Sequence, residues 1–279
     1  MKSKPEALYL ELMKKTLAFA LWPEPPTPLD TFNYQRPALK RLLVSFISRL
    51  LGSRHLQIVK QMAPSAESRE EGRIWPGYAD TMIGLKRLDN LQFCVETVIR
   101  ERIAGDLIET GVWRGGACIL MRAVLAAYAI EDRKVYVADS FAGLPTPDAE
   151  KFPADKGDDH HIHSILAVSQ QEVENNFRRF GLLDDQVVFL KGWFKDTLPN
   201  APVEQLAVLR LDGDMYGSTW DALTNLYPKL SSGGFCIIDD YALEGCRRAV
   251  DDFRVMHGIQ AEMKVVDWSG TYWRKAYRR

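Results

Sequence analysis

The chain has 279 residues, 46% of them hydrophobic, and a formal net charge of −1 from 36 basic and 37 acidic side chains. This length allows one large core with a small additional subdomain. The balanced charge excludes the basic excess that is typical of nucleic-acid-binding proteins, so no nucleic acid partner is expected.

Cysteine usage and hydropathy indicate a cytoplasmic protein without a transmembrane segment. The four cysteines, Cys94, Cys118, Cys236 and Cys246, form no CxxC pair, and four in a chain of this length do not make a disulfide scaffold. We expect buried, reduced thiols in a cytoplasmic protein. No run of about 18 apolar residues occurs, so no transmembrane segment is expected. The apolar run at 17–22 is too short for a signal peptide.

The first 75 residues differ from the rest of the chain. An amphipathic helix is expected at 6–21, a proline-rich break at 22–28 and a second helix at 38–51, where leucines and a phenylalanine recur at helical spacing among basic residues. A mobile linker is expected at 64–77. For the helix at 38–51 a membrane-surface role is one interpretation, and a cap or oligomer contact packed on the main domain is the favoured one.

From residue 85 the pattern alternates between helices and short apolar runs. Helices are expected at 85–102, 116–130, 166–180, 219–230 and 244–257, and strands at 106–109, 134–139, 186–190, 206–211, 234–238, 261–267 and 271–277. Such alternation predicts an α/β fold with a mainly parallel sheet covered on both faces, in which the last two strands are antiparallel neighbours. We therefore divide the chain into a helical cap and linker at 1–77 and a main domain at 78–279.

A glycine-rich turn follows the first strand of this domain. Residues 109–116 read ETGVWRGG, which is neither GxGxxG nor a P-loop. Glycines there let a ligand approach the backbone, and Glu109 would repel a pyrophosphate but suit the positive amino or sulfonium group of S-adenosylmethionine. A purely structural turn is the alternative.

The second strand ends at Asp139. An acidic residue at this position accepts hydrogen bonds from the ribose hydroxyls of an adenosine-containing cofactor. The alternative is that Asp139 caps the following turn, because Asp-Ser is common turn chemistry. The preceding glycine turn favours the nucleoside interpretation.

Four aspartates follow two strands that we expect to be neighbours. Asp212 and Asp214 end one strand, and Asp239 and Asp240 end the next. Bunched carboxylates repel one another unless a positive group lies among them, and all-oxygen ligands favour Mg²⁺, Mn²⁺ or Ca²⁺ over Zn²⁺. Helix-capping aspartates are the alternative.

Two further segments carry candidate groups. Residues 157–163 read GDDHHIH, which indicates either a histidine metal site or, as we favour, a lid over the cofactor crevice; His160 and His161 are reserve candidates for a general base. After the third strand, Gly192 and Trp193 either face the adenine ring or pack in the core.

Taken together, these motifs resemble the macrocin O-methyltransferase (TylF-type) family, which methylates sugar hydroxyls in antibiotic and related pathways. The resembling stretches are YADTMIGLKRLDNL at 78–91, LIETGVWRGG at 107–116, VADSFAGLP at 137–145, GWFKDTLP at 192–199 and LRLDGDMYGST at 209–219.

The resemblance implies a Rossmann-like class I methyltransferase fold, with seven strands of which the last is antiparallel. It implies S-adenosylmethionine as methyl donor, a Mg²⁺-type metal (or Mn²⁺ or Ca²⁺) held by Asp212, Asp239 and Asp240, and Asp214 as the base. The cofactor-binding residues would be Thr81, Met82, Glu109, Thr110, Gly111, Gly115, Asp139, Ser140, Gly192 and Trp193. The acceptor would be a glycosylated small molecule, selected in part by residues 1–75, which match the family poorly.

Other functions explain fewer of these residues. An NAD-dependent nucleotide-sugar oxidoreductase requires GxGxxG and Tyr-xxx-Lys, yet no lysine stands four positions after Tyr241, Tyr272 or Tyr277. A metal-dependent phosphatase leaves the glycine turn and Asp139 without a role, and a non-catalytic binding protein leaves the aspartates unused. A catechol-type acceptor on the same metal-dependent scheme is the closest alternative. The apolar N-terminal helices are compatible with assembly into a homo-oligomer.

Overall fold

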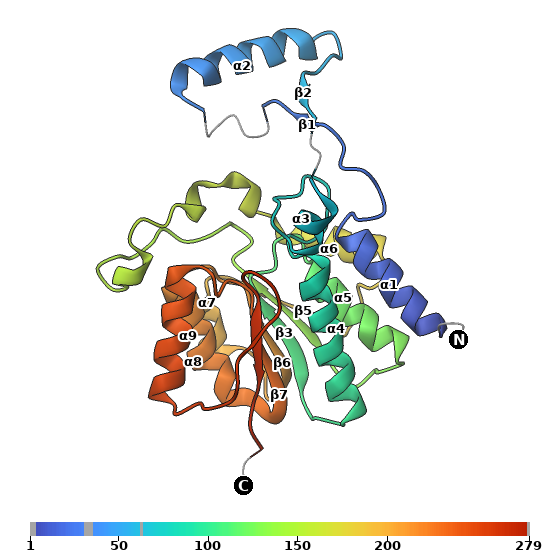
Figure 1. Cartoon of the computed structure of the whole chain (residues 1–279), viewed down its shortest axis with the longest axis vertical. Helices are drawn as coiled ribbons and strands as arrows, with labels where there is room; N and C mark the ends of the chain where they lie inside the picture. Colours follow the sequence, from blue (N-terminus) through green and yellow to red (C-terminus); the bar gives the residue numbers. More distant parts are fainter. Residues whose placement is uncertain (1–3, 31–35, 62–63, 278–279) are drawn as a thin grey trace.

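The computed structural model describes residues 4–30, 36–61 and 64–277 (Figure 1). At its centre lies a seven-stranded sheet in the order β5-β4-β3-β6-β7-β9-β8. The strands are β3 (Asp106–Thr110), β4 (Val135–Asp139), β5 (Val187–Lys191), β6 (Leu206–Leu211), β7 (Leu230–Ile238), β8 (Lys264–Val265) and β9 (Thr271–Arg274). Neighbours from β5 to β7 pair in parallel, whereas β9 is antiparallel to both β7 and β8. The expected mostly parallel fold with an antiparallel last strand is confirmed.

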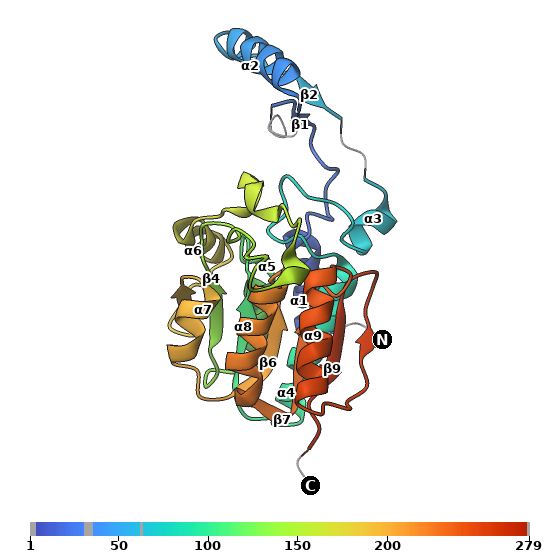
Figure 2. The same cartoon turned by 90° about the vertical axis from the view of Figure 1, so that its left-hand side faces the viewer.

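Helices cover both faces of this sheet. On one face lie α4 (Leu85–Arg100) and α5 (Gly116–Ala127), and on the other lie α8 (Tyr216–Leu226) and α9 (Glu244–Met256) (Figures 1 and 2). Every residue of β6 is buried, which explains why the central strands read as continuous apolar runs. The remaining helices of this part are α6 (Gln170–Arg179) and the short α7 (Phe194–Thr197).

Parallel pairing brings the carboxyl ends of β3, β4, β6 and β7 to one edge of the sheet. Thr110 pairs with Leu211 in β6, and Leu211 pairs with Ile238 in β7. The residues that follow these four strands, including the glycine turn and the aspartates, therefore meet at the same edge. Ligands of open α/β sheets bind at this edge.

The N-terminal residues form two separate structures. Helix α1 (Pro5–Leu17) packs on the sheet-covering helices, with Leu10 and Leu17 fully buried in the same core as α4 and α5. The antiparallel pair β1 (Thr27–Pro28) and β2 (Val59–Lys60) and helix α2 (Ala38–Gly52) stand away from the body in both views (Figures 1 and 2). No residue of α2 is buried, so the expected packing of this helix on the main domain is not observed.

Residues that were expected to form a mobile linker are instead ordered against the body. Helix α3 (Ala66–Glu70) begins at Ser65, whose hydroxyl accepts the amide hydrogen of Ser68 at 3.0 Å. The chain then contacts Gly84, where an added Cβ would lie 2.2 Å from the carbonyl oxygen of Glu70. This close approach holds the segment against the start of α4.

Two further expectations concern cysteines and membranes. All four cysteines are buried and free of disulfides. Among the described residues, no helix is both long and apolar enough to cross a bilayer.

Candidate active site

A cavity of about 400 Å³ lies at the carboxyl edge of the sheet. Its floor comprises the residues that follow β3, β4, β6 and β7, and its walls come from two loops, residues 72–75 and 143–166, together with Trp268 and Ser269. The two loops are therefore the parts of the chain that enclose a ligand above the sheet.

Gly111 is fixed by the close approach of two main-chain segments. It adopts a φ of +83°, and an added Cβ would lie 1.7 Å from the carbonyl oxygen of Asp212. The amide of Asp212 also donates to the carbonyl oxygen of Thr110 at 2.9 Å. Since only glycine fits this position, the turn after β3 lies directly against the aspartate-bearing turn after β6.

Glu109 lies at the floor of the cavity beneath this turn. Its carboxylate accepts a hydrogen bond from the Cys118 thiol at 2.9 Å and forms an ion pair with Arg210. Burial raises the pKa of Glu109, and the neighbouring Arg210 opposes that rise. The resulting arrangement holds a buried carboxylate at the cavity surface, and its contact with a cationic group of a cofactor stays a prediction.

Asp139 caps its own turn and also lines the cavity. Its two carboxylate oxygens accept the amide hydrogens of Val112 and Phe141, both at 2.7 Å. Burial raises the pKa of Asp139, while these amide donors lower it. The contact with Phe141 agrees with the capping interpretation from the sequence, and ribose binding by Asp139 stays a prediction.

Most of the predicted cofactor-binding residues line the cavity. Those that do are Thr81, Met82, Glu109, Gly111, Asp139, Ser140, Gly192 and Trp193. Thr110 and Gly115 are not among the lining residues. Thr110 is fully buried within β3, and Gly115, at a φ of +86°, packs against Val173, where a Cβ would lie 2.7 Å from a methyl group. These two residues therefore support the turn from its core side and do not face the cavity.

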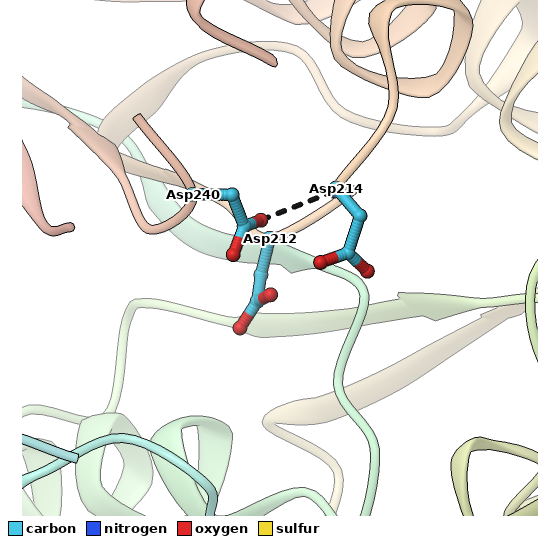
Figure 3. Close-up of side chains that lie close together, drawn as sticks. All are labelled: Asp212, Asp214 and Asp240. Atoms are coloured by element: carbon cyan, nitrogen blue, oxygen red, sulfur yellow. Dashed lines mark hydrogen bonds between the residues drawn. The ribbon is translucent and has the colours of Figure 1, made fainter. Parts of the chain in front are cut away.

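Three aspartates come together at the other end of the cavity. Asp212, Asp214 and Asp240 each offer one carboxylate oxygen, and these oxygens lie within 4.8 Å of one another (Figure 3). The backbone amide of Asp214 donates to Oδ2 of Asp240 at 3.1 Å. Asp214 has a φ of +56°, a left-handed conformation that aspartate tolerates better than most residues. The local backbone thus turns the Asp214 side chain toward its two neighbours.

Asp239, which was expected to be the third metal ligand, has different partners. Its carboxylate forms ion pairs with Arg87 from α4 and Arg210 from β6. Arg210 is 1% exposed and also contacts Glu109 and, at 2.9 Å, Asp212. In this structure, Asp214 therefore takes the place in the carboxylate cluster that the sequence had assigned to Asp239.

The electrostatics of the cluster suit a hard cation. Burial and mutual repulsion raise the pKa values of Asp212 and Asp240 well above their usual range. Burial likewise raises the pKa of Asp214 to about 6, and the nearby His160 lowers it. Three crowded carboxylates with only oxygen donors are the ligand chemistry of Mg²⁺, Mn²⁺ and Ca²⁺, so the residues present fit a divalent cation.

The histidine-containing loop forms a wall of the cavity, as expected for a lid. Asp155 anchors it by accepting the amide hydrogens of Tyr216 at 2.6 Å and Gly217 at 3.0 Å, at the start of α8. His160 lines the cavity, and its Nδ1 lies 2.9 Å from Asp158. His161 is exposed and does not line the cavity, so it is not placed to act as a base.

Several residues of the site were not identified from the sequence. Arg87, Arg210, Asp155 and Trp268 either line the cavity or hold residues that do. Arg210 had a visible signal, because it is a charged residue within the otherwise apolar strand sequence LAVLRL. The others lie far in sequence from the groups that they contact, so no local pattern indicates them.

Comparison with known proteins decides the family of this chain. A model of the Macrocin-O-methyltransferase (TylF) family matches residues 6–275. The chain belongs to this family. It is an O-methyltransferase, and its fold is one that uses S-adenosylmethionine. Family membership overturns the oxidoreductase and phosphatase alternatives.

Three curated relatives in the macrocin O-methyltransferase family are about half identical to the chain. The 8-demethyl-8-(2,3-dimethoxy-alpha-L-rhamnosyl)-tetracenomycin-C 4'-O-methyltransferase of Streptomyces olivaceus is 50% identical over 96% of this chain and 92% of its own length. The demethyldecarbamoylnovobiocin O-methyltransferase of Streptomyces niveus is 48% identical over 96% and 94%. The mycinamicin III 3''-O-methyltransferase of Micromonospora griseorubida is 50% identical over 85% and 94%.

Solved structures agree with this family assignment. The O-methyltransferase NovP superimposes with a TM-score of 0.83 at 46% identity, covering 98% of this chain and 100% of that one. The calicheamicin methyltransferase CalS11 superimposes with a TM-score of 0.53 at 18% identity, over 67% of this chain and 79% of that one, which shows a shared fold alone.

Proposed function

We propose that this enzyme transfers the methyl group of S-adenosylmethionine to a sugar hydroxyl of a glycosylated small molecule, with the help of a divalent cation. The observation that carries the proposal is the juxtaposition, in one cavity, of the Glu109–Gly111 cofactor turn and the Asp212, Asp214 and Asp240 carboxylates. The close approach of Gly111 to the Asp212 carbonyl supports the proposal, because it brings the turn proposed for the methyl donor beside the aspartates proposed for the acceptor.

The sugar acceptor is supported by the relatives. The relative from S. olivaceus is named for 4'-O-methylation of a rhamnosylated tetracenomycin. The relative from M. griseorubida is named for 3''-O-methylation of mycinamicin III. Both are half identical to this chain, so a hydroxyl of a glycosylated natural product is the acceptor class that we propose here.

We propose that Asp212 and Asp240 bind the cation, because both the sequence and the carboxylate cluster select them. The sequence also predicts Asp239 as a third ligand, and this stays a prediction. In the structure its carboxylate pairs with Arg87 and Arg210. When bound, S-adenosylmethionine supplies the methyl group, and the cation lowers the pKa of a coordinated hydroxyl.

Asp214 is the base in this proposal. Its carboxylate lines the cavity beside Asp212 and Asp240, and a pKa of about 6 leaves it ionised at neutral pH while it can still accept a proton. His160 suits the role less well. Burial lowers its pKa, but the charge of Asp214 and the hydrogen bond to Asp158 outweigh burial and raise the pKa, which favours the protonated imidazole.

The first experiment measures thermal stability with S-adenosylmethionine, its demethylated product or NAD, each with and without Mg²⁺. A ligand at about 1,000 times its dissociation constant stabilises the native state by roughly 4 kcal/mol, which is readily visible. We expect stabilisation by the methionine cofactors and not by NAD. Stabilisation by NAD alone would refute the proposed cofactor.

A second experiment separates the acceptor classes. Transfer of labelled methyl groups is compared between a rhamnosylated polyketide, its aglycone and a simple catechol. We expect transfer to the glycoside only, and loss of that transfer with EDTA. Transfer to the catechol but not to the glycoside would favour the catechol alternative.

A further inference from the structure

Residues 77–83 form an irregular segment at the cavity wall, which we call the strap. It lies between α3 and α4 and forms neither helix nor strand. Thr81, Met82 and Ile83 of the strap line the cavity. Since an irregular segment lacks the main-chain hydrogen bonds of a helix or a sheet, its polar main-chain groups need other partners, and these partners fix its position.

The partners of the strap come from the end of the glycine turn. Nη1 of Arg114 donates to the main-chain carbonyl oxygens of Gly77 and Ala79, both at 2.9 Å. The amide of Gly116 donates to the carbonyl oxygen of Asp80, also at 2.9 Å. Three carbonyls of the strap are therefore held by two residues of the turn.

Gly116 allows the strap to lie directly on the start of α5. An added Cβ would lie 2.5 Å from the carbonyl oxygen of Asp80 and 2.7 Å from the Cβ of Thr81. Packed interiors do not tolerate contacts this short, so a side chain at this position would displace the strap. The strap and the glycine turn thus meet main chain to main chain.

The Arg114 side chain is itself held in place. Its guanidinium carbon lies 4.3 Å from the centroid of the Trp113 ring, and its main-chain carbonyl accepts a hydrogen bond from the buried Asn176 at 2.9 Å. A guanidinium that stacks on an aromatic ring is pre-organised, so little side-chain entropy is lost when it donates hydrogen bonds. Arg114 is not among the described residues that line the cavity, so any effect on a ligand passes through the strap.

We propose that Arg114 is a positioning residue for the cofactor, whose guanidinium holds the strap on the glycine turn and so keeps Thr81 and Met82 at the cavity wall. On the proposed function this cavity binds S-adenosylmethionine, and the role of Arg114 depends on that. A strap that is released for part of the time lowers the affinity in proportion, because the cofactor then binds only the fraction of molecules with the strap in place.

Arg133 offers a matched control at the opposite end of the sheet. Like Arg114, it is half-buried, and burial lowers the pKa of both guanidinium groups. It also donates to two main-chain carbonyls, those of Ile103 and Gly105. Those carbonyls precede β3, whereas the glycine turn follows it. Replacing either arginine by methionine removes the same kind of contact, but only the contacts of Arg114 lie beside the cavity.

Isothermal titration calorimetry of the full chain with S-adenosylhomocysteine, the demethylated cofactor product, tests this role. We expect Arg114→Met to raise the Kd at least about tenfold, which corresponds to about 1.4 kcal/mol. Arg133→Met should leave the Kd unchanged. Arg114→Lys should recover most of the affinity, because both strap carbonyls accept from one nitrogen and an ammonium group can supply both hydrogens.

A second variant releases the strap without altering Arg114. Gly116→Ala adds a Cβ that meets the Asp80 carbonyl oxygen, so the Kd should rise in this variant as well. Hydrogen exchange followed by mass spectrometry reports on the strap directly and needs no ligand. Exchange of residues 77–83 should be faster in Arg114→Met and Gly116→Ala than in wild type or Arg133→Met, while exchange of α9 stays the same in all four proteins.

The outcomes for wild type and for the variants answer different questions. A wild type that binds no S-adenosylhomocysteine would refute the proposed function, and the role of Arg114 with it. Wild-type binding with an unchanged Kd in Arg114→Met would overturn the role of Arg114 alone. An equal rise of the Kd in Arg133→Met, or unchanged exchange of the strap in Arg114→Met, would also overturn it and would assign Arg114 to the general stability of the fold.

Discussion

Replacing Arg210 with methionine tests the electrostatic centre of the site. Arg210 is 1% exposed and forms ion pairs with Glu109, Asp212 and Asp239. Methionine keeps an unbranched apolar stem of similar length but leaves the buried Glu109 and the part-buried Asp212 without their cation, while Asp239 keeps Arg87. Breaking a buried ion pair by removing one partner costs about 3–5 kcal/mol. For a domain of this size, that cost lowers the melting temperature by on the order of 6–15 °C.

The destabilisation should depend on pH in a definite direction. Arg210 lowers the raised pKa of Glu109, so its removal raises the folded-state pKa of Glu109 further. The added cost is fully present only above that raised pKa, and it is lost as pH falls through the folded-state pKa, because a protonated Glu109 needs no cation. The difference in melting temperature between wild type and Arg210→Met should therefore shrink as pH falls from 7 to 5.

Differential scanning calorimetry measures this difference. Arg248→Met is the matched control, because Arg248 is 58% exposed and its Glu244 partner lies 3.6 Å away, a geometry worth under about 1 kcal/mol. A loss of less than 2 °C for Arg210→Met, or a loss equal to that of the control, would refute the inference that Arg210 holds these carboxylates together.

Three more predictions concern the reacting groups. Asp212→Asn should abolish Mg²⁺-dependent stabilisation and nearly all turnover, while affinity for the demethylated cofactor product persists; near-normal turnover would exclude Asp212 as a ligand. Because Asp214 must be ionised to accept a proton, kcat/KM should fall as pH drops through about 6, or lower with metal bound, and this limb should vanish in Asp214→Asn. Gly111→Ala should abolish cofactor binding, since its Cβ would meet the Asp212 carbonyl oxygen at 1.7 Å. The matched control is Gly258→Ala, where φ is +59° and no atom lies within 4 Å of the added Cβ, so the free energy of unfolding should fall by only about 1 kcal/mol. Equal effects of the two substitutions on stability and on cofactor binding would show that backbone conformation alone matters.

The sheet and its catalytic edge were predictable because their signals are local. Each strand is a short apolar run bounded by a turn, and parallel pairing then requires that Asp139, Asp212 and Asp240 share one edge. The resemblance to a family implied seven strands with the last antiparallel, whereas the order of the strands, including the insertion of β9 between β7 and β8, is known only from the structure. Periodicity alone would not have supplied it.

Contacts between distant segments were not predictable. Asp239 reads like Asp240 in the sequence, but Arg87 from α4 and Arg210 from β6 form ion pairs with Asp239. Residues 64–77 looked like a linker because they are polar, yet the contact of Gly84 with the Glu70 carbonyl holds them against the body. Thr110 and Gly115 belong to the predicted motif, but Thr110 is fully buried within β3 and Gly115 packs against Val173.

The contact between Gly111 and the Asp212 carbonyl also bears on how acceptor range can change. The proposed donor and acceptor ends of the cavity approach each other main chain to main chain, whereas the walls come from residues 72–75 and 143–166. Substitutions in those loops can remodel the space around an acceptor without altering the distance between the two ends. On the proposed function, chemistry and substrate range would be separable in this enzyme, and engineering for new acceptors should begin in the two loops.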